Sequence, residues 1–184
     1  MIKFGTISTA NITPRALINP CIDEPKAQVM SIAARSKARA EEFARCHGIS
    51  RVYDSYEEVI ADDETNAFYN PLPISMHKEW TIKALRAGKH VLCEKSFASN
   101  ALEAKEMEAA GAETGLVLMD AFHYRYHPVF IRAKEIMESG EIGRVERINA
   151  AFHVPVSDPD NIRMNYNLGG GVTMDIGCYP CLLY

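Results

Sequence analysis

This 184-residue sequence has no long apolar run, no excess of positive charge and no recognisable leader. No apolar run approaches the roughly 18 residues of a membrane-spanning helix. The formal net charge is −4 and the pI about 5.9, which excludes the basic footprint of a nucleic-acid-binding protein. Because the first residues enter a strand pattern directly, no signal peptide is expected. We therefore expect a cytoplasmic protein that binds neither membranes nor nucleic acid.

The cysteines lack the number and spacing of a disulfide framework. There are five, an odd number without regular spacing, which favours reduced thiols in a cytosolic protein. Cys178 and Cys181 form a C-x-x-C pair, but without the context of a thioredoxin or a second pair to bind zinc. Repeats and low-complexity segments are also missing. The sequence therefore predicts no metal site.

Strand and helix patterns alternate over the first ~120 residues, which is typical of a parallel, doubly wound α/β sheet of the Rossmann type. Strands are predicted at 2–7, 27–34, 67–70, 91–93 and 116–119. Helices are predicted to begin at Pro14 and to span 36–47, 55–62, 78–87 and 101–114. Asn70 ends one strand inside the expected core, where an unpaired amide would cost about 1–3 kcal/mol.

The turn after the first strand has none of the glycines of a dinucleotide-binding fingerprint. The turn comprises Ser8, Thr9, Ala10, Asn11 and Ile12. Thr13 would cap the helix that Pro14 begins, and the N–H groups of such a helix end hold a pyrophosphate. Ser8, Ala10 and Thr13 stand at the three glycine positions of G-x-G-x-x-G. Small side chains permit close approach, but a φ angle reserved for glycine would be strained.

The second strand also lacks the acidic residue that binds a ribose 2′-hydroxyl. Ala34 stands at that position, and Arg35, Ser36 and Arg39 follow. Nothing repels a 2′-phosphate, and guanidinium groups four residues apart can face one phosphate. The pattern predicts NADP in preference to NAD. The alternative is a pair of surface arginines on the helix 36–47.

The stretch from Gly88 to Ser96 brings a carboxylate and an amine to the end of a strand. Gly88 is the residue expected just past a helix C-terminus. The apolar run 91–93 suits a strand buried on both faces. Glu94 and Lys95 then lie at the carboxyl edge, where open α/β sheets bind ligands. Lys95 is a candidate for proton transfer, and the alternative is a solvated loop pair.

The segment from His90 to Lys95 resembles the Glu-Lys-Pro signature of the Gfo/Idh/MocA oxidoreductases, with Ser96 in place of the family's proline. The resemblance implies that Lys95 is catalytic and that the nicotinamide lies against the strand ends, beside Glu94. The arginines resemble those that bind NADP in the dihydrodiol dehydrogenase branch. We therefore expect a Rossmann-type domain that uses NADP.

Two further segments extend the resemblance. The loop 71–77 resembles the family's Pro-x-x-x-His loop over the nicotinamide, which implies cofactor contacts for Leu72, Pro73 and His77. His77 has a second possible role in capping and packing, and both stay open.

The segment 169–179 matches the family's Gly-Gly-Gly…Asp-x-Gly-x-Tyr/His segment. The match implies that Tyr179 works with the lysine and that Asp175 orients the substrate. Arg125 and His127 lie where the family enters its second domain. They could line a polyol site, whereas the aromatic residues of the same segment could equally pack between domains.

The resemblance divides the chain into a dinucleotide-binding domain, 1–121, and the incomplete start of an α+β substrate domain, 122–184. The second part is predicted to contain a helix at 128–139, a strand at 144–153 and a helix that reaches Tyr184. Because family members are much longer, we expect a fragment, an abbreviated product or a partial gene model that does not turn over substrate by itself. A homo-oligomer through the sheet of a complete second domain is possible.

The favoured hypothesis is an NADP-dependent oxidoreductase that transfers a hydride between nicotinamide and a CH–OH group of a sugar, polyol or diol. Lys95, assisted by Tyr179, would move the hydroxyl proton. The resemblance is to the dihydrodiol and D-xylose dehydrogenases. A cofactor-binding relative without turnover is the alternative, because Ser8, Asn70 and Ser96 depart from the family pattern. A structural domain without either activity is the third.

Overall fold

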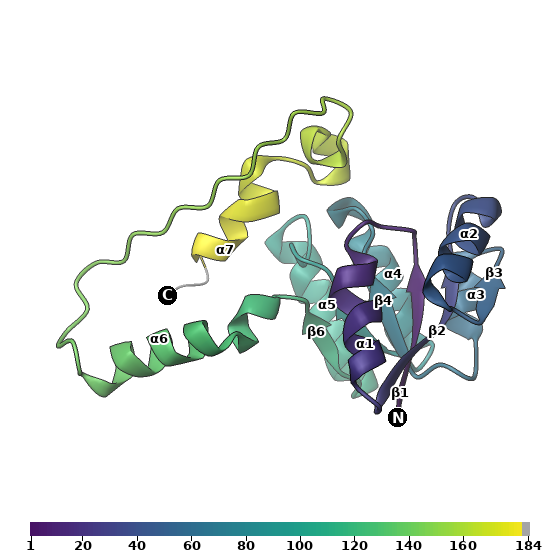
Figure 1. The fold of residues 1–184 in the computed structure, drawn as a ribbon, viewed down its shortest axis with the longest axis horizontal. Coiled ribbons are helices and arrows are strands. Elements are labelled where there is room, and N and C mark those ends of the chain that lie inside the picture. The colour runs from purple at the N-terminus through teal and green to yellow at the C-terminus, as the bar shows by residue number, and fades with distance from the viewer. Residues whose placement is uncertain (182–184) are drawn as a thin grey trace. The chain divides into compact units, whose positions relative to one another are not determined.

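A computed structural model describes residues 1–181 of the chain, which divides into a compact unit Met1–Asp120 and a second unit that begins at Ala121 (Figure 1). The first unit is a six-stranded parallel sheet in the order β3-β2-β1-β4-β5-β6. Its strands are β1 (Ile2–Ile7), β2 (Ala27–Ala33), β3 (Arg51–Tyr53), β4 (Ala67–Asn70), β5 (His90–Cys93) and β6 (Leu118–Asp120). This is the strand order of the doubly wound dinucleotide-binding folds. The chain adds β2 and β3 on one side of β1, and then β4, β5 and β6 on the other side, so the strand order switches between β1 and β4.

Helices cover both faces of this sheet. After a π-helical turn, Pro14–Ile18, they are α1 (Asn19–Asp23), α2 (Lys37–His47), α3 (Tyr56–Ala61), α4 (His77–Arg86) and α5 (Ala101–Thr114). Phe68 of β4 packs into a cluster with residues of α3, α4 and α5, whereas its neighbour Tyr69 packs into a cluster with residues of α1 and α2. Successive side chains of a strand point to opposite faces, so β4 contributes to both halves of the core. Each large apolar side chain buried there is worth about 1.5–3 kcal/mol.

The ends of the helices follow the local rules that the sequence predicts. Ser36, Ser55 and Asn100 each accept a hydrogen bond from a backbone N–H three residues later. Gly48 and Gly115 end α2 and α5 with φ angles of 70° and 66°. In this left-handed region glycine pays no side-chain penalty.

Thr13 is not the helix cap that was expected. Its φ and ψ angles of −54° and −44° are already helical, and its side chain makes no capping bond. Its backbone N–H donates to the carbonyl of Ala10 at 3.0 Å. The prediction of a cap was wrong because the helical path begins one residue earlier, with a π-helical turn.

Three strand predictions also need correction. The short strand β3 was missed because Arg51–Tyr53 is only half-buried and too short to show alternation. The last strand of the sheet is Leu118–Asp120 rather than 116–119. The strand expected at 144–153 is not formed. Residues 145–158 are irregular, and Val145 and Phe152 are 37% and 45% exposed. An extended segment needs a pairing partner to become a strand, and residues 1–181 supply none.

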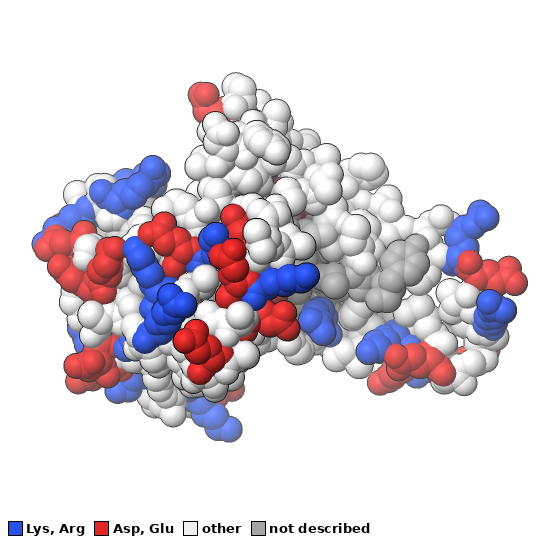
Figure 2. Space-filling model, turned by 180° about the vertical axis from the view of Figure 1, so that it is seen from behind, with Lys and Arg blue, Asp and Glu red and all other residues white. Residues whose placement is uncertain are grey.

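The second unit contains one long helix, α6 (Pro128–Ser139), and a helical segment made of a π-helical turn, Thr173–Gly177, and α7 (Cys178–Cys181). The predicted end of this helix at Tyr184 lies outside the described residues. Among residues 1–181 no helix has the length and apolarity to cross a membrane. Figure 2 shows basic and acidic side chains interspersed over the face it presents, without a large patch of one sign.

Candidate functional site

The turn after β1 lies at the carboxyl edge of the sheet, beside the end of β2. Ile7 is in register with Ala33, and the Ser8 N–H donates to the Ala33 carbonyl at 2.7 Å. Ser8 has a φ angle of 74°, the only positive φ of a non-glycine residue in the described part of the chain. Serine therefore occupies the conformation that glycine favours, as the sequence predicts. Beyond it, Asn11 and Ile12 are exposed.

The end of β2 presents the two predicted arginines to solvent. Ala34 is buried, whereas Arg35 and Arg39 are exposed. Ser36 caps α2 by accepting the N–H of Arg39. Neither guanidinium forms a salt bridge within residues 1–181. Both are thus available to an anionic ligand at the edge where Ser8 lies.

Asn70 closes β4 and holds the loop that follows it. Its side chain is fully buried, its Nδ2 donates to the His77 carbonyl and to Thr81 Oγ1 at 3.2 Å each, and its Oδ1 accepts the Leu72 N–H at 3.3 Å. The cost of burying an amide is therefore offset by three hydrogen bonds. The departure from an apolar strand fixes the loop that carries Leu72 and Pro73.

His77 begins α4 and is fully buried. Its Nδ1 lies 2.9 Å from the Ser96 carbonyl and its Nε2 lies 2.7 Å from the Leu72 carbonyl. Burial lowers the pKa of this imidazole, although the backbone carbonyls and Glu94 act in the opposite direction. Of the two roles left open by the sequence, this geometry supports packing and positioning, because both ring nitrogens have backbone partners.

Glu94 and Lys95 follow β5 at the same carboxyl edge. The Glu94 N–H donates to the Asn70 carbonyl at 3.0 Å, which continues the β4–β5 pairing. The Tyr69 hydroxyl donates to Glu94 Oε1 at 2.7 Å, and the Lys95 N–H donates to Oε2 at 3.3 Å. The Lys95–Ser96 peptide bond is cis. Lys95 is half-buried, and it lies where the sequence predicts the catalytic lysine.

Two of the predicted substrate-site residues belong to the second unit. Asp175 accepts a hydrogen bond from Arg163 Nε at 2.8 Å, so its carboxylate is held by an ion pair. The centroid of the Tyr179 ring lies 5.3–5.5 Å from the ring centroids of Phe122, Tyr124 and Phe152. The Tyr124 hydroxyl donates to the Tyr179 carbonyl at 3.5 Å.

Of the two residues suggested for a polyol site, His127 has a local role. It precedes α6, and its Nδ1 accepts the Val129 N–H at 3.2 Å. Arg125 is exposed. The structure therefore gives His127 a helix-capping function.

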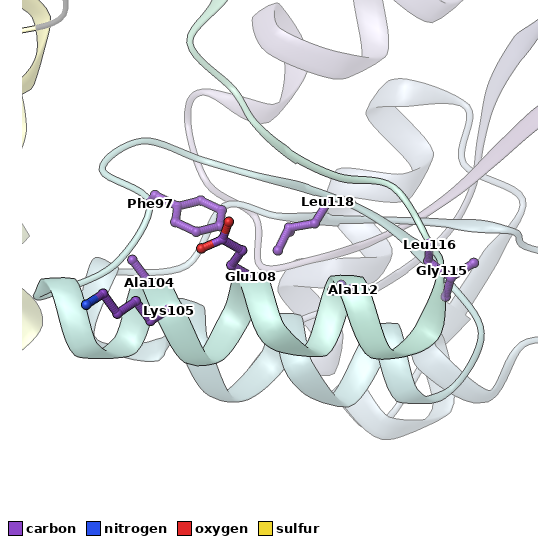
Figure 3. Close-up of a pocket in the computed structure, with 9 residues that line it drawn as sticks. Phe97, Ala104, Lys105, Glu108, Ala112, Gly115, Leu116 and Leu118 are labelled. Carbon is purple, nitrogen blue, oxygen red and sulfur yellow. The ribbon is translucent and has the colours of Figure 1, made fainter.

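A cavity of about 640 Å³ lies along α5 in the first unit (Figure 3). Phe97 and Leu118 line it beside α5, and Lys105 and Glu108 contribute from the helix. None of the predicted site residues lines it. We therefore assign the candidate site to the carboxyl edge of the sheet, where the turn after β1, the loop after β4 and the Glu94–Lys95 pair meet, and not to this cavity.

Sequence reasoning located most of these residues but missed Tyr69 and Thr81. Tyr69 looked like one more apolar residue in a buried strand, and Thr81 like one more helix residue. The sign that they have a role is the hydroxyl group that each places in the core, because a buried hydroxyl needs a hydrogen-bond partner. The partners, Glu94 and Asn70, lie on neighbouring elements that only the register brings close.

The strand order and this edge are those of a dinucleotide-binding unit. A family model described as "Oxidoreductase family, NAD-binding Rossmann fold" matches residues 2–122, and the GFO/IDH/MocA C-terminal domain matches residues 130–183. The chain belongs to the Gfo/Idh/MocA oxidoreductase family.

Named relatives span almost the whole chain. It is 39% identical to a D-xylose 1-dehydrogenase (NADP(+)) of Haloferax volcanii over 97% of this chain and 54% of the relative. It is 34% identical to a trans-1,2-dihydrobenzene-1,2-diol dehydrogenase of Xenopus laevis over 96% of this chain and 54% of the relative. A 3-ketoreductase from Actinomadura kijaniata in complex with NADP and TDP-benzene superposes with a TM-score of 0.91 and 35% identity, over 97% of this chain and 55% of that structure. The chain spans about half the length of the relatives it matches.

Proposed function

We propose that the protein is an NADP-dependent oxidoreductase that transfers a hydride between nicotinamide and a CH–OH group of a sugar, polyol or diol. The observation that carries the proposal is the position of Glu94 and Lys95, which lie after β5 at the carboxyl edge of a sheet with the order 3-2-1-4-5-6. Nucleotide ligands bind at this edge in doubly wound sheets. Two of the named relatives are a D-xylose dehydrogenase and a dihydrodiol dehydrogenase, whose named substrates share this reacting group.

The residues of the turn after β1 and of the β2 end fit NADP. The cofactor, when bound, supplies or accepts the hydride. Ser8, Thr9, Ala10, Asn11 and Ile12 would lie along its pyrophosphate. Arg35 and Arg39, which form no salt bridge within the described chain, would bind the 2′-phosphate beside Ser36. NAD, which lacks this phosphate, would gain nothing from them.

At the reacting centre, Lys95 would exchange the hydroxyl proton with the assistance of Tyr179, while Asp175 orients the substrate. Leu72, Pro73 and Glu94 would contact the cofactor, and His77 would hold their loops together. Solved forms of the Actinomadura reductase include ones with a replaced lysine and one with a replaced tyrosine. Those two positions are separated by the same number of residues as Lys95 and Tyr179, which supports treating the pair as functional partners.

We further propose a boundary between a dinucleotide-binding domain, 1–121, and a substrate domain that begins at 122. A cytoplasmic location fits the five cysteines, all of which are free thiols. Self-association through the sheet of a complete second domain remains part of the proposal.

Cofactor titration tests the proposal directly. NADPH and NADH are titrated into the protein while the fluorescence of the reduced nicotinamide is followed. Charge-assisted bonds to a phosphate are worth about 1.5–3 kcal/mol each, so we expect at least tenfold tighter binding of NADPH. Arg35→Ala should remove most of that preference.

Arg45→Ala is the matched control, because Arg45 is an exposed arginine on α2, the helix that follows Arg35, but it pairs with Glu42. It should leave the preference unchanged. Equal affinities for the two cofactors in the unaltered protein would refute the NADP assignment.

The alternative of a cofactor-binding relative without turnover is favoured by one observation, the serine at position 96. Incubation with NADP⁺ and a panel of sugars and diols, followed by absorbance of the reduced cofactor, separates the two. Binding without turnover would select the alternative.

A further inference from the structure

One buried side chain beside the site has a polar atom that no role described so far uses. Tyr69 lies in β4 and is fully buried in the cluster that includes Leu17, Ile32 and Ala44. Its hydroxyl donates to Glu94 Oε1 at 2.7 Å. A phenylalanine would supply the same apolar packing, so the feature specific to tyrosine here is this hydrogen bond.

The donor is permanent. Burial, and after it the negative charge of Glu94, raises the pKa of the Tyr69 phenol far above its ordinary value. The hydroxyl therefore keeps its proton, and remains a donor, at neutral pH. A hydrogen bond from such a donor to a carboxylate is among the stronger ones in proteins.

The other oxygen of the Glu94 carboxylate accepts a hydrogen bond from the backbone of Lys95, the proposed catalytic residue. Glu94 Oε2 accepts the Lys95 N–H at 3.3 Å, and the Glu94 N–H itself donates to the Asn70 carbonyl at 3.0 Å. The carboxylate thus bridges a rigid strand of the core and the first peptide beyond β5. If the Tyr69 hydroxyl were removed, one anchor of that bridge would be lost while the backbone pairing of β4 and β5 stayed intact.

We propose that Tyr69 is a positioning residue, which acts through Glu94 to fix the backbone at Lys95 and the cofactor-facing end of β5. The inference rests on the proposed function for its catalytic meaning, but its structural content does not depend on a bound cofactor. Tyr69 itself touches neither substrate nor cofactor in this role.

The first test is amide exchange at Lys95, measured by NMR in the 184-residue protein without ligand. In Tyr69→Phe we expect Lys95 exchange to be about tenfold faster, with no comparable change at the amides of Phe68 and Leu92. Tyr56→Phe is the matched control. It also removes a hydroxyl from a half-buried tyrosine of the first unit, but its ring packs on Trp80, in a different cluster of the core from Tyr69. Equal acceleration along β4 and β5 would reduce Tyr69 to a general packing role.

The second test is a double-mutant cycle on the dissociation constant of NADPH, with Tyr69→Phe, Glu94→Ala and the double variant. If Tyr69 acts through Glu94, each single variant weakens binding and the double variant is no weaker than Glu94→Ala. Additive losses would overturn the proposal. Failure of the unaltered protein to bind NADPH would refute the proposed function, and the exchange measurement would still decide the role of Tyr69.

Discussion

At the scale of single residues, Ser8 occupies a conformation that its neighbours impose. Its φ angle of 74° costs a residue with a Cβ about 1–2 kcal/mol, and its N–H is held by the Ala33 carbonyl at 2.7 Å. The sequence already showed that a serine stands at a glycine position of the fingerprint. The angle confirms that the backbone path is retained although the glycine is not.

Ser8→Gly should therefore raise the free energy of unfolding, by about 0.5–1 kcal/mol after allowing for the greater freedom of glycine in the unfolded chain. Urea unfolding measures it. Gly48→Ser is the reverse control, since Gly48 has a φ angle of 70° and open space around an added Cβ, and it should lose a similar amount. A loss of stability in Ser8→Gly would mean that the serine side chain stabilises the turn by more than the strain costs.

At the scale of elements, His77 joins two loops that follow different strands. Its ring links the Leu72 carbonyl after β4 to the Ser96 carbonyl after β5. A neutral imidazole donates through only one nitrogen, so protonation would complete the second bond but would place a charge in the core. Burial lowers the pKa of His77 by more than the backbone carbonyls and Glu94 raise it, so the pKa lies below its ordinary value.

This shift makes stability depend on pH in a defined direction. Because the folded pKa lies below the ordinary value near 6.5, the unfolded chain binds more protons as the pH falls below that value. The free energy of unfolding should then fall by up to about 1.4 kcal/mol per pH unit until the folded pKa is reached. Urea unfolding at pH 7.5 and about pH 5.5 measures the slope.

His77→Gln should flatten that slope, whereas His153→Gln, at an exposed position in the second unit, should leave it unchanged. Identical slopes in the unaltered protein and in His77→Gln would show that other groups control the pH dependence.

Which elements could be predicted depends on whether their signal is local. Apolar runs and capping residues such as Ser55 and Asn100 act within a few residues, and the structure has the corresponding helices. The prediction of a strand at 144–153 was wrong because alternating apolar residues indicate which face of a strand would be buried, but not which other strand would pair with it. The link between Tyr69 and Glu94 could not be predicted because it depends on the register of β4 against β5.

At the scale of the whole molecule, the two units differ in how far their backbone N–H and C=O groups are paired within helices and strands. Every strand of the first unit is paired, whereas residues 145–158 of the second unit form neither helix nor strand. Apolar side chains of that segment are exposed, among them Phe152 and Val154 at 45% and 47%. Such a segment opens to solvent far more readily than a core strand.

Hydrogen exchange followed by mass spectrometry should resolve this difference. Peptides that contain β1, β4 and β5 should exchange several orders of magnitude more slowly than peptides from 145–158. NADPH should protect the peptides that contain Ser8 and Lys95 further. Strong protection of 145–158 in the 184-residue chain would mean that a second copy or another segment pairs with it, and dilution would then distinguish the two.

The parallel sheet has a practical consequence for protein engineering. All strands point the same way, so every proposed cofactor contact in the first unit lies at one edge and the opposite edge is left for connections. Glu24, Pro25 and Lys26, which lead into the start of β2, are exposed at that opposite edge. A fluorescent protein or an affinity tag inserted between Glu24 and Pro25 would report on the folded unit from the side remote from the nucleotide.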